Sequence, residues 1–126
     1  MANKKTGPWT EAEQRACIKA YHAMLYRECT HSVNKAAVNR WLRGESKDSD
    51  HHVIAEAFKE NPYWPVSANG ALAKRSRGSL EMKMMNISAA RAELGLPQIN
   101  GYKPLGNIQT SLKLMVADEA GLNGRD

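Results

Sequence analysis

The segment KRSRGS brings together the side-chain types that bind an anion. Its two arginines carry planar guanidinium groups whose paired donors match the geometry of a phosphate. Its two serines offer hydroxyl groups, and its glycine lets another backbone approach closely. Because a predicted helix begins here, unpaired N–H groups and a partial positive charge are expected at the same place. The candidate nucleic-acid-binding residues in this segment are Lys74, Arg75, Ser76, Arg77 and Ser79.

Three polar residues further along continue this pattern. Ser79, Lys83 and Asn86 are spaced by four and three residues, which places them on one side of a helix. Lys83 can reach a guanine or a phosphate, and the amide of Asn86 can read a base edge. The same residues also have structural interpretations, since Ser79 is a natural helix cap and Asn86 can form hydrogen bonds inside the protein. These residues alone therefore suggest nucleic-acid binding without specifying it.

The charge distribution points to the same region. The 126-residue chain has a formal net charge of +5 and a pI near 9.4, which suits a polyanionic partner. Between residues 71 and 103 only Glu81 and Glu93 are acidic. The basic residues of the same segment are Lys74, Arg75, Arg77, Lys83, Arg91 and Lys103.

Helical spacing of apolar residues and strong helix punctuation predict an all-α fold. Thr10 followed by Glu13 is a capping box, and Asn34 and Gly44 are a plausible cap and stop for a second helix. We expect a compact bundle of about five helices over residues 11–29, 34–43, 50–61, 79–94 and 107–120.

The remaining segments are expected to be loops or flexible ends. The segment NPYWPVSANG reads as an ordered loop held by Tyr63 and Trp64, and a short strand is considered for residues 98–103. The whole chain, 1–126, is predicted to be a single domain, with a flexible basic arm at 1–8 and a flexible tail at 121–126.

The second half of the chain resembles a known family. The sequence RSRGSLEMKMMNISAARAELGLPQINGYKPLGNIQTSL is similar to a small helical domain at the N-terminus of some HNH-family and restriction-type endonucleases. The shared pattern is Arg-Ser, Ser-hydrophobic-Glu-x-Lys, Asn-Ile-Ser and a Gly-Tyr-Lys-Pro loop. The segments WTEAE, AYHAML and NKAAVNRWL extend the resemblance to the first half, whereas residues 45–70 match weakly.

The resemblance implies DNA recognition or targeting rather than chemistry. It implies nucleic-acid contacts from Arg75, Ser76, Lys83, Asn86, Tyr102 and Lys103. In the family such a domain precedes a nuclease, and no His and Asn pattern of an HNH site follows it here. We therefore expect a double-stranded DNA-binding module without its own catalytic site. The alternative is a phage or mobile-element protein-interaction module that inhibits or recruits a host nuclease or defence protein.

Other kinds of site find little support in the sequence. The spacing of Cys17, His22, Cys29 and His31 fits no common zinc motif, so no metal site and no cofactor are expected. The opening GPWTEAEQ also resembles the start of a Myb-type domain, although the tryptophans are not evenly spaced as that repeat needs. With two cysteines, no apolar run of membrane-spanning length and no secretory signal, a non-enzymatic cytoplasmic protein is expected.

Overall fold

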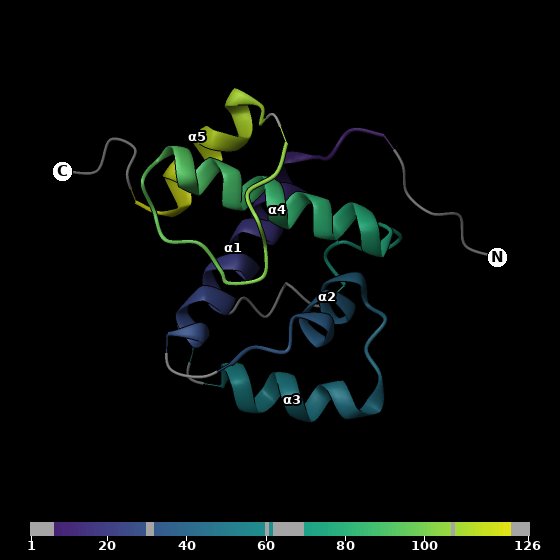
Figure 1. Ribbon diagram of the computed structural model, residues 1–126. Coiled ribbons are helices and arrows are strands. Elements are labelled where there is room, and N and C mark those ends of the chain that lie inside the picture. The colour runs from purple at the N-terminus through teal and green to yellow at the C-terminus, as the bar shows by residue number, and fades with distance from the viewer. Residues whose placement is uncertain (1–6, 30–31, 60, 62–69, 107, 122–126) are drawn as a thin grey trace.

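A computed structural model describes residues 7–29, 32–59, 61, 70–106 and 108–121. These residues form five helices and no strand, so the predicted all-α class is confirmed (Figure 1). The helices are α1 (Glu11–Glu28), α2 (Lys35–Arg43), α3 (Asp48–Phe58), α4 (Arg77–Glu93) and α5 (Thr110–Glu119).

The five helices pack as two groups around α1. Helices α4 and α5 pack against each other and against α1, whereas α2 and α3 pair with each other at the other end of the molecule (Figure 1). The chain after α4 returns across the outer side of that helix before it enters α5 (Figure 1). This return brings residues 99–106 close to α1, α2 and α4.

Three predicted helix ends are confirmed by their hydrogen bonds. Thr10 accepts from the Glu13 N–H at 3.1 Å, and the Glu13 carboxylate accepts from the Thr10 N–H at 2.9 Å, which completes the capping box. Asn34 caps α2 by accepting from the Ala37 N–H. Gly44 ends α2 with a φ of 70°, in the left-handed region that glycine tolerates best.

Other predicted boundaries were wrong by a few residues. Helix α4 begins at Arg77 rather than Ser79, because the hydroxyl of Ser76 accepts the Ser79 N–H and so makes Ser76 the cap. Helix α3 begins at Asp48 rather than at residue 50 and ends at Phe58. Helix α5 begins later than expected, at Thr110.

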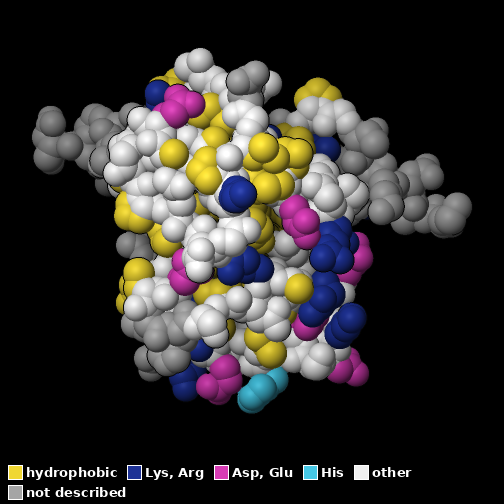
Figure 2. Space-filling model, in the orientation of Figure 1, with side chains coloured by type: hydrophobic (Ala, Val, Ile, Leu, Met, Phe, Trp, Pro, Cys, Tyr) yellow, Lys and Arg dark blue, Asp and Glu magenta, His cyan; other side chains and the backbone are white. Residues whose placement is uncertain are grey.

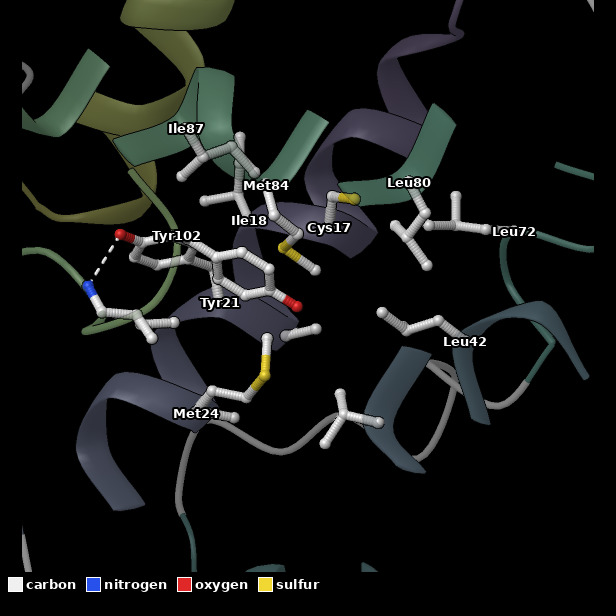
Figure 3. Close-up of a cluster of buried hydrophobic side chains, with 14 of the residues drawn as sticks. Cys17, Ile18, Tyr21, Met24, Leu42, Leu72, Leu80, Met84, Ile87 and Tyr102 are labelled. Atoms are coloured by element: carbon white, nitrogen blue, oxygen red, sulfur yellow. Dashed lines mark hydrogen bonds between the residues drawn. The ribbon is translucent and has the colours of Figure 1, made fainter. Parts of the chain in front are cut away.

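One cluster of buried apolar side chains holds the helices together (Figure 3). Its centre is Tyr21, whose ring stacks on that of Tyr102 with centroids 6.4 Å apart. The Tyr21 hydroxyl bonds to the Ser88 hydroxyl at 2.6 Å and accepts the N–H of Ile99 at 2.9 Å. The helical spacing of Leu80, Met84, Ile87 and Leu94 predicts one apolar stripe, of which the first three are fully buried and Leu94 is partly buried.

The short strand considered for residues 98–103 is not formed in this described segment. The N–H of Ile99 is taken by the Tyr21 side chain, a bond drawn in Figure 3, and the N–H of Tyr102 bonds back to the Ile99 carbonyl in a turn. The segment therefore has no partner strand. Residues 62–69, which include Tyr63 and Trp64, lie outside the described residues.

Within the described residues, none of the helices combines the length and apolar character that crossing a membrane requires.

Candidate nucleic-acid interface

Arg75 is buried inside the protein, with 2% of its surface exposed. Its Nε and one terminal nitrogen each donate to the carboxylate of Glu13 at 2.9 Å. The terminal nitrogens also donate to the carbonyls of Gly7 and Pro8. Its guanidinium carbon lies 4.6 Å from the centroid of the Trp9 ring.

These contacts correct the prediction that Arg75 binds phosphate. All of its described partners belong to the protein, and its guanidinium group cannot reach a ligand without breaking the ion pair with Glu13. Burying that pair without other hydrogen bonds would be costly, but the two carbonyls raise the number of hydrogen bonds from the arginine to four. Arg75 therefore fastens the start of α1 to the segment that precedes α4.

The prediction that Tyr102 contacts nucleic acid is also wrong, because this residue is buried. It is 6% exposed, its ring packs on Tyr21, and its hydroxyl donates to the side-chain oxygen of Asn39 at 3.3 Å. Burial raises the pKa of the Tyr102 phenol to about 12. Its neighbour Lys103 is exposed.

The residues around the first turn of α4 form an open surface, which we call the α4 entrance: Lys74, Ser76, Arg77 and Gly78. The side chain of Arg77 is 74% exposed, and its ion-pair partner among the described residues is Glu81, one turn along the helix, at 3.0 Å. The first intrahelical bond runs from the Leu80 N–H to the Ser76 carbonyl, so the N–H groups of Arg77 and Gly78 precede it and point out of the helix end. A Cβ added at Gly78 would meet nothing within 4 Å.

Positive charge gathers on this side of the molecule. Figure 2 shows Lys and Arg side chains crowded along the right-hand edge, on the side where α4 begins in Figure 1, with acidic side chains among them. A solvated cation beside the positive end of a helix is unfavourable for the protein alone and favourable next to an anion.

Lys83 and Asn86 lie together, as their spacing predicted. Both line a cavity of about 280 Å³ between the start of α1, the middle of α4 and the turn before α5. The amine of Lys83 lies 5.0 Å from the Trp9 ring centroid. Burial lowers the pKa of that amine, and the neighbouring Arg75 guanidinium lowers it further.

The side-chain amide of Asn86 also has a structural role. Its Nδ2 donates to the Leu105 carbonyl at 2.6 Å and holds the chain that crosses α4. The adjacent Gly106 has a φ of 90°, and a Cβ there would come within 2.9 Å of the Asn86 Nδ2. Ser79 uses its backbone N–H for the Ser76 cap and is partly exposed.

The sequence did not predict that Trp9 and Gln14 would be among the residues that line this cavity. Trp9 contributes its ring and Gln14 its amide, and both come from the start of α1, about seventy residues before Lys83. The capping box at Thr10 and Glu13 showed that α1 begins here. Nothing in the spacing of these residues indicated that this helix end would lie against the middle of α4.

The other candidate groups are dispersed. Cys17 is fully buried, which raises the pKa of its thiol, whereas Cys29 is exposed. His31 lies outside the described residues. Within the described part of the chain, no three His, Cys, Asp or Glu side chains lie together as metal ligands do.

Comparison of the chain with protein-family models, with curated proteins and with solved structures found no match in any of the three.

Proposed function

We propose that the protein is a DNA-binding or targeting module without a catalytic site of its own, and that it docks the phosphate backbone at the α4 entrance. Lys74, Arg77 and Lys103 supply exposed cations for the phosphates, and the N–H groups of the first turn of α4 supply further donors. Arg75 and Tyr102 act from inside the protein by fixing the segments that carry these groups.

The observation that carries the proposal is the backbone of Lys74. It has a φ of 72° and is the one non-glycine residue with a positive φ in the described chain. That conformation costs a residue with a Cβ about 1–2 kcal/mol, and glycine avoids the cost. An exposed lysine in this position gives up stability to keep a cation beside the first turn of α4, and strain of this kind is concentrated at functional sites.

Fluorescence anisotropy with a labelled DNA duplex, repeated at several salt concentrations, tests the proposal. The double variant Lys74→Ala/Arg77→Ala removes two exposed cations from the α4 entrance. We expect it to weaken binding on duplexes of any sequence and to reduce the slope of log K against log salt by about two.

A matched control removes the same charge elsewhere. Lys19 on α1 and Lys59 after α3 are exposed, and the variant Lys19→Ala/Lys59→Ala changes the net charge equally. The proposal expects this control to keep most of the affinity and slope of the wild type. Equal losses in the two double variants would show that only net charge matters and would reject the α4 entrance as the docking surface.

A second candidate function is a protein-interaction module that inhibits or recruits a nuclease or defence protein. The observation that favours it is apolar exposure on the outer side of α4. Met82 and Leu105 are each 45% exposed, and Leu105 donates its N–H to the Met85 carbonyl, one helical turn beyond Met82. Exposed methionine and leucine side chains adapt well to a partner surface.

Affinity purification after nuclease treatment separates the two functions. A protein partner in stoichiometric amount that is lost with Met82→Ser/Leu105→Ser, but kept with Lys74→Ala/Arg77→Ala, would support the interaction module. Recovery of nucleic acid alone from untreated samples would reject it.

A further inference from the structure

A second cavity lies at the opposite end of α4 from the α4 entrance, and we call it the Arg91 cavity. It is lined by the second half of α1, by the last turn of α4 with the residues after it, and by the end of α5. Its volume is about 310 Å³, and pockets that enclose small ligands measure roughly 300–1,000 Å³. The lining includes the apolar residues Leu25, Leu96 and Ala120 and the cationic Arg91. A small molecule therefore fits beside a buried positive charge.

The described partners of Arg91 are all uncharged. The residue is 5% exposed, its Nε donates to the Pro97 carbonyl, and its Nη1 donates to the Nε2 of His22 at 2.9 Å. An imidazole nitrogen that accepts from a guanidinium group belongs to a neutral ring. The guanidinium carbon also lies 5.7 Å from the centroid of the Tyr21 ring. These contacts satisfy two nitrogens of Arg91 and leave its charge without a counter-ion.

Three other arginines of the protein have the counter-ion that Arg91 lacks. Arg15, Arg40 and Arg75 each donate to at least one carboxylate, and these hydrogen bonds raise their pKa values. Among the described residues, Arg91 forms no such bond, and burial lowers the pKa of its guanidinium group. Burying a charge is costly unless an opposite charge compensates for the lost water. An anion in the Arg91 cavity would provide that compensation.

The free nitrogen of Arg91 can be reached from the cavity. Its Nη2 donates to no described residue and, in contrast to the Oε1 of Gln14, is not fully enclosed. Glu119 also lines the cavity, but its carboxylate accepts from Arg15 at 2.9 Å, so its charge is already balanced. The cavity therefore offers one cationic donor group together with an apolar wall.

We propose that the Arg91 cavity binds a small monocarboxylic acid with an apolar body, whose carboxylate accepts from the Nη2 of Arg91 while its hydrocarbon part contacts Leu25, Leu96 and Ala120. Hydrogen bonds between a guanidinium group and a carboxylate are strong because both partners are charged. One uncompensated cation matches one negative charge, which favours a carboxylate over a phosphate monoester with its nearly double charge. The inference does not depend on DNA binding, since the α4 entrance is at the other end of the helix.

Three probes with the same six-carbon chain test the inference: hexanoate, hexylamine and 1-hexanol. They differ in the head group, so they separate recognition of the carboxylate from contact with the chain. Titration of the ¹⁵N-labelled full chain, followed by NMR, measures the Kd of each probe. We expect hexanoate to bind about tenfold or more tightly than either of the others. The Nε–H signal of Arg91 should shift with hexanoate and stay in place with hexylamine.

Cys29 gives an independent measurement on the unaltered protein. It is exposed and lines the cavity, whereas Cys17 is fully buried. Saturating hexanoate should slow the reaction of Cys29 with the neutral reagent N-ethylmaleimide, because the bound acid covers that side of the cavity. Hexylamine at the same concentration should leave the rate unchanged. An equal rate with and without hexanoate would contradict binding in this cavity.

Two variants and a matched control locate the site. Ala120→Phe fills the cavity without touching Arg91 and should abolish hexanoate binding. Ala36→Phe adds the same ring at an exposed position on α2 and should bind hexanoate as the wild type does. Arg91→Lys keeps the charge but removes the planar group of donors, so hexanoate should bind about fivefold or more weakly.

The possible results either support or overturn the site. Equal affinities for the three probes would overturn it, because the chain alone would then be recognised. Hexanoate binding that survives in Ala120→Phe would also overturn it, since the acid would be bound elsewhere. Absence of any shift with hexanoate would overturn it directly. If a variant does not fold, the probe comparison and the Cys29 rates on the wild type still decide.

Discussion

Arg75 and Arg77 are two residues apart in the same basic segment, yet the protein uses them in opposite ways. Arg75 is 2% exposed, and its guanidinium group is surrounded by the Glu13 carboxylate, two backbone carbonyls and the Trp9 ring. Arg77 is 74% exposed and, within the part of the chain that the structure describes, pairs with Glu81 on the helix surface. The Ser76 cap lies between them and turns the chain from the buried side of the protein into the first turn of α4.

The difference shows that basic residues close together in the sequence can be either buried in ion pairs or exposed to solvent. A buried, bidentate arginine holds the segment before α4 against the start of α1, and the arginine two residues later stays exposed to solvent. Of the basic side chains between residues 71 and 103, Arg75 and Arg91 are buried, Lys83 is half-buried, and Lys74, Arg77 and Lys103 are exposed. A count of charges along the chain therefore overstates the surface that can contact DNA.

The largest loss of stability is expected when the buried arginine, Arg75, is replaced. Arg75→Ala leaves the Glu13 carboxylate buried without its counter-ion, which should cost about 3–5 kcal/mol in the free energy of unfolding. Arg77→Ala removes a solvated surface pair and should change that free energy by about 0.5 kcal/mol or less. Urea denaturation of both variants measures the difference, and similar losses would contradict the division between the two arginines.

A second buried arginine, Arg91, makes the stability of the protein depend on pH through its contact with His22. Its NH1 lies 2.9 Å from the Nε2 of His22, so that nitrogen must be an acceptor and the imidazole neutral. Burial, together with the neighbouring Arg91 charge, lowers the pKa of His22 to about 4. The unfolded chain therefore binds more protons than the folded one between pH 6.5 and 4, and the His22 contribution to stability is lost as the pH falls through this range.

The matching measurement is the unfolding free energy of wild type and His22→Gln at pH 7 and at pH 4.5. On acidification, the wild type should lose about 1–3 kcal/mol more than the variant, because the variant has no imidazole to charge. His52→Gln, at an exposed position on α3, is the control and should follow the wild type. Parallel losses in all three proteins would show that His22 charges at no cost.

Variants of the exposed residue Lys74 test whether its strained backbone is linked to DNA binding. Lys74→Gly should relieve the strain of a φ of 72° and stabilise the fold by about 1 kcal/mol, while it weakens DNA binding through the lost cation. Lys74→Ala removes the same charge but keeps the Cβ, so it should weaken binding equally without the gain in stability. Denaturation and anisotropy on the two variants together measure both effects. A Lys74→Gly variant that binds DNA as the wild type does would remove the functional reason for the strained lysine.

The smallest expected effect concerns Tyr102, which was predicted to contact DNA and is buried. Tyr102→Phe removes one long hydrogen bond to Asn39 and keeps the ring on Tyr21, so the loss of stability should be about 0.5–1 kcal/mol. DNA affinity should be unchanged in anisotropy titrations. A marked loss of DNA affinity in a variant of native stability would show that the Tyr102 hydroxyl contacts DNA after all.

Local features of the fold could be predicted from the sequence, because their causes lie within a few residues. The capping box of Thr10 and Glu13, the Asn34 cap, the Gly44 stop and the buried stripe of α4 are of this kind. The choice of Ser76 over Ser79 as cap was missed, since both serines have the required chemistry and the hydrogen bond alone decides between them.

The candidate site could be predicted only in part, because its residues depend on contacts between distant segments. Helical spacing brought Lys83 and Asn86 together correctly. Spacing could not show that Glu13, sixty-two residues earlier, takes Arg75 out of the surface, or that Trp9 and Gln14 close the cavity. The charge of an arginine is visible in a sequence, whereas its counter-ion is set by tertiary packing.

The central claim, that DNA docks at the α4 entrance, is tested most directly by amide NMR shifts of the ¹⁵N-labelled protein during titration with a short duplex. The largest shifts are expected at the N–H groups of Arg77 and Gly78, with smaller ones at Lys74 and Lys103 and little change along α3. Saturable shifts centred on α3 or α5, with the first turn of α4 unmoved, would contradict the claim.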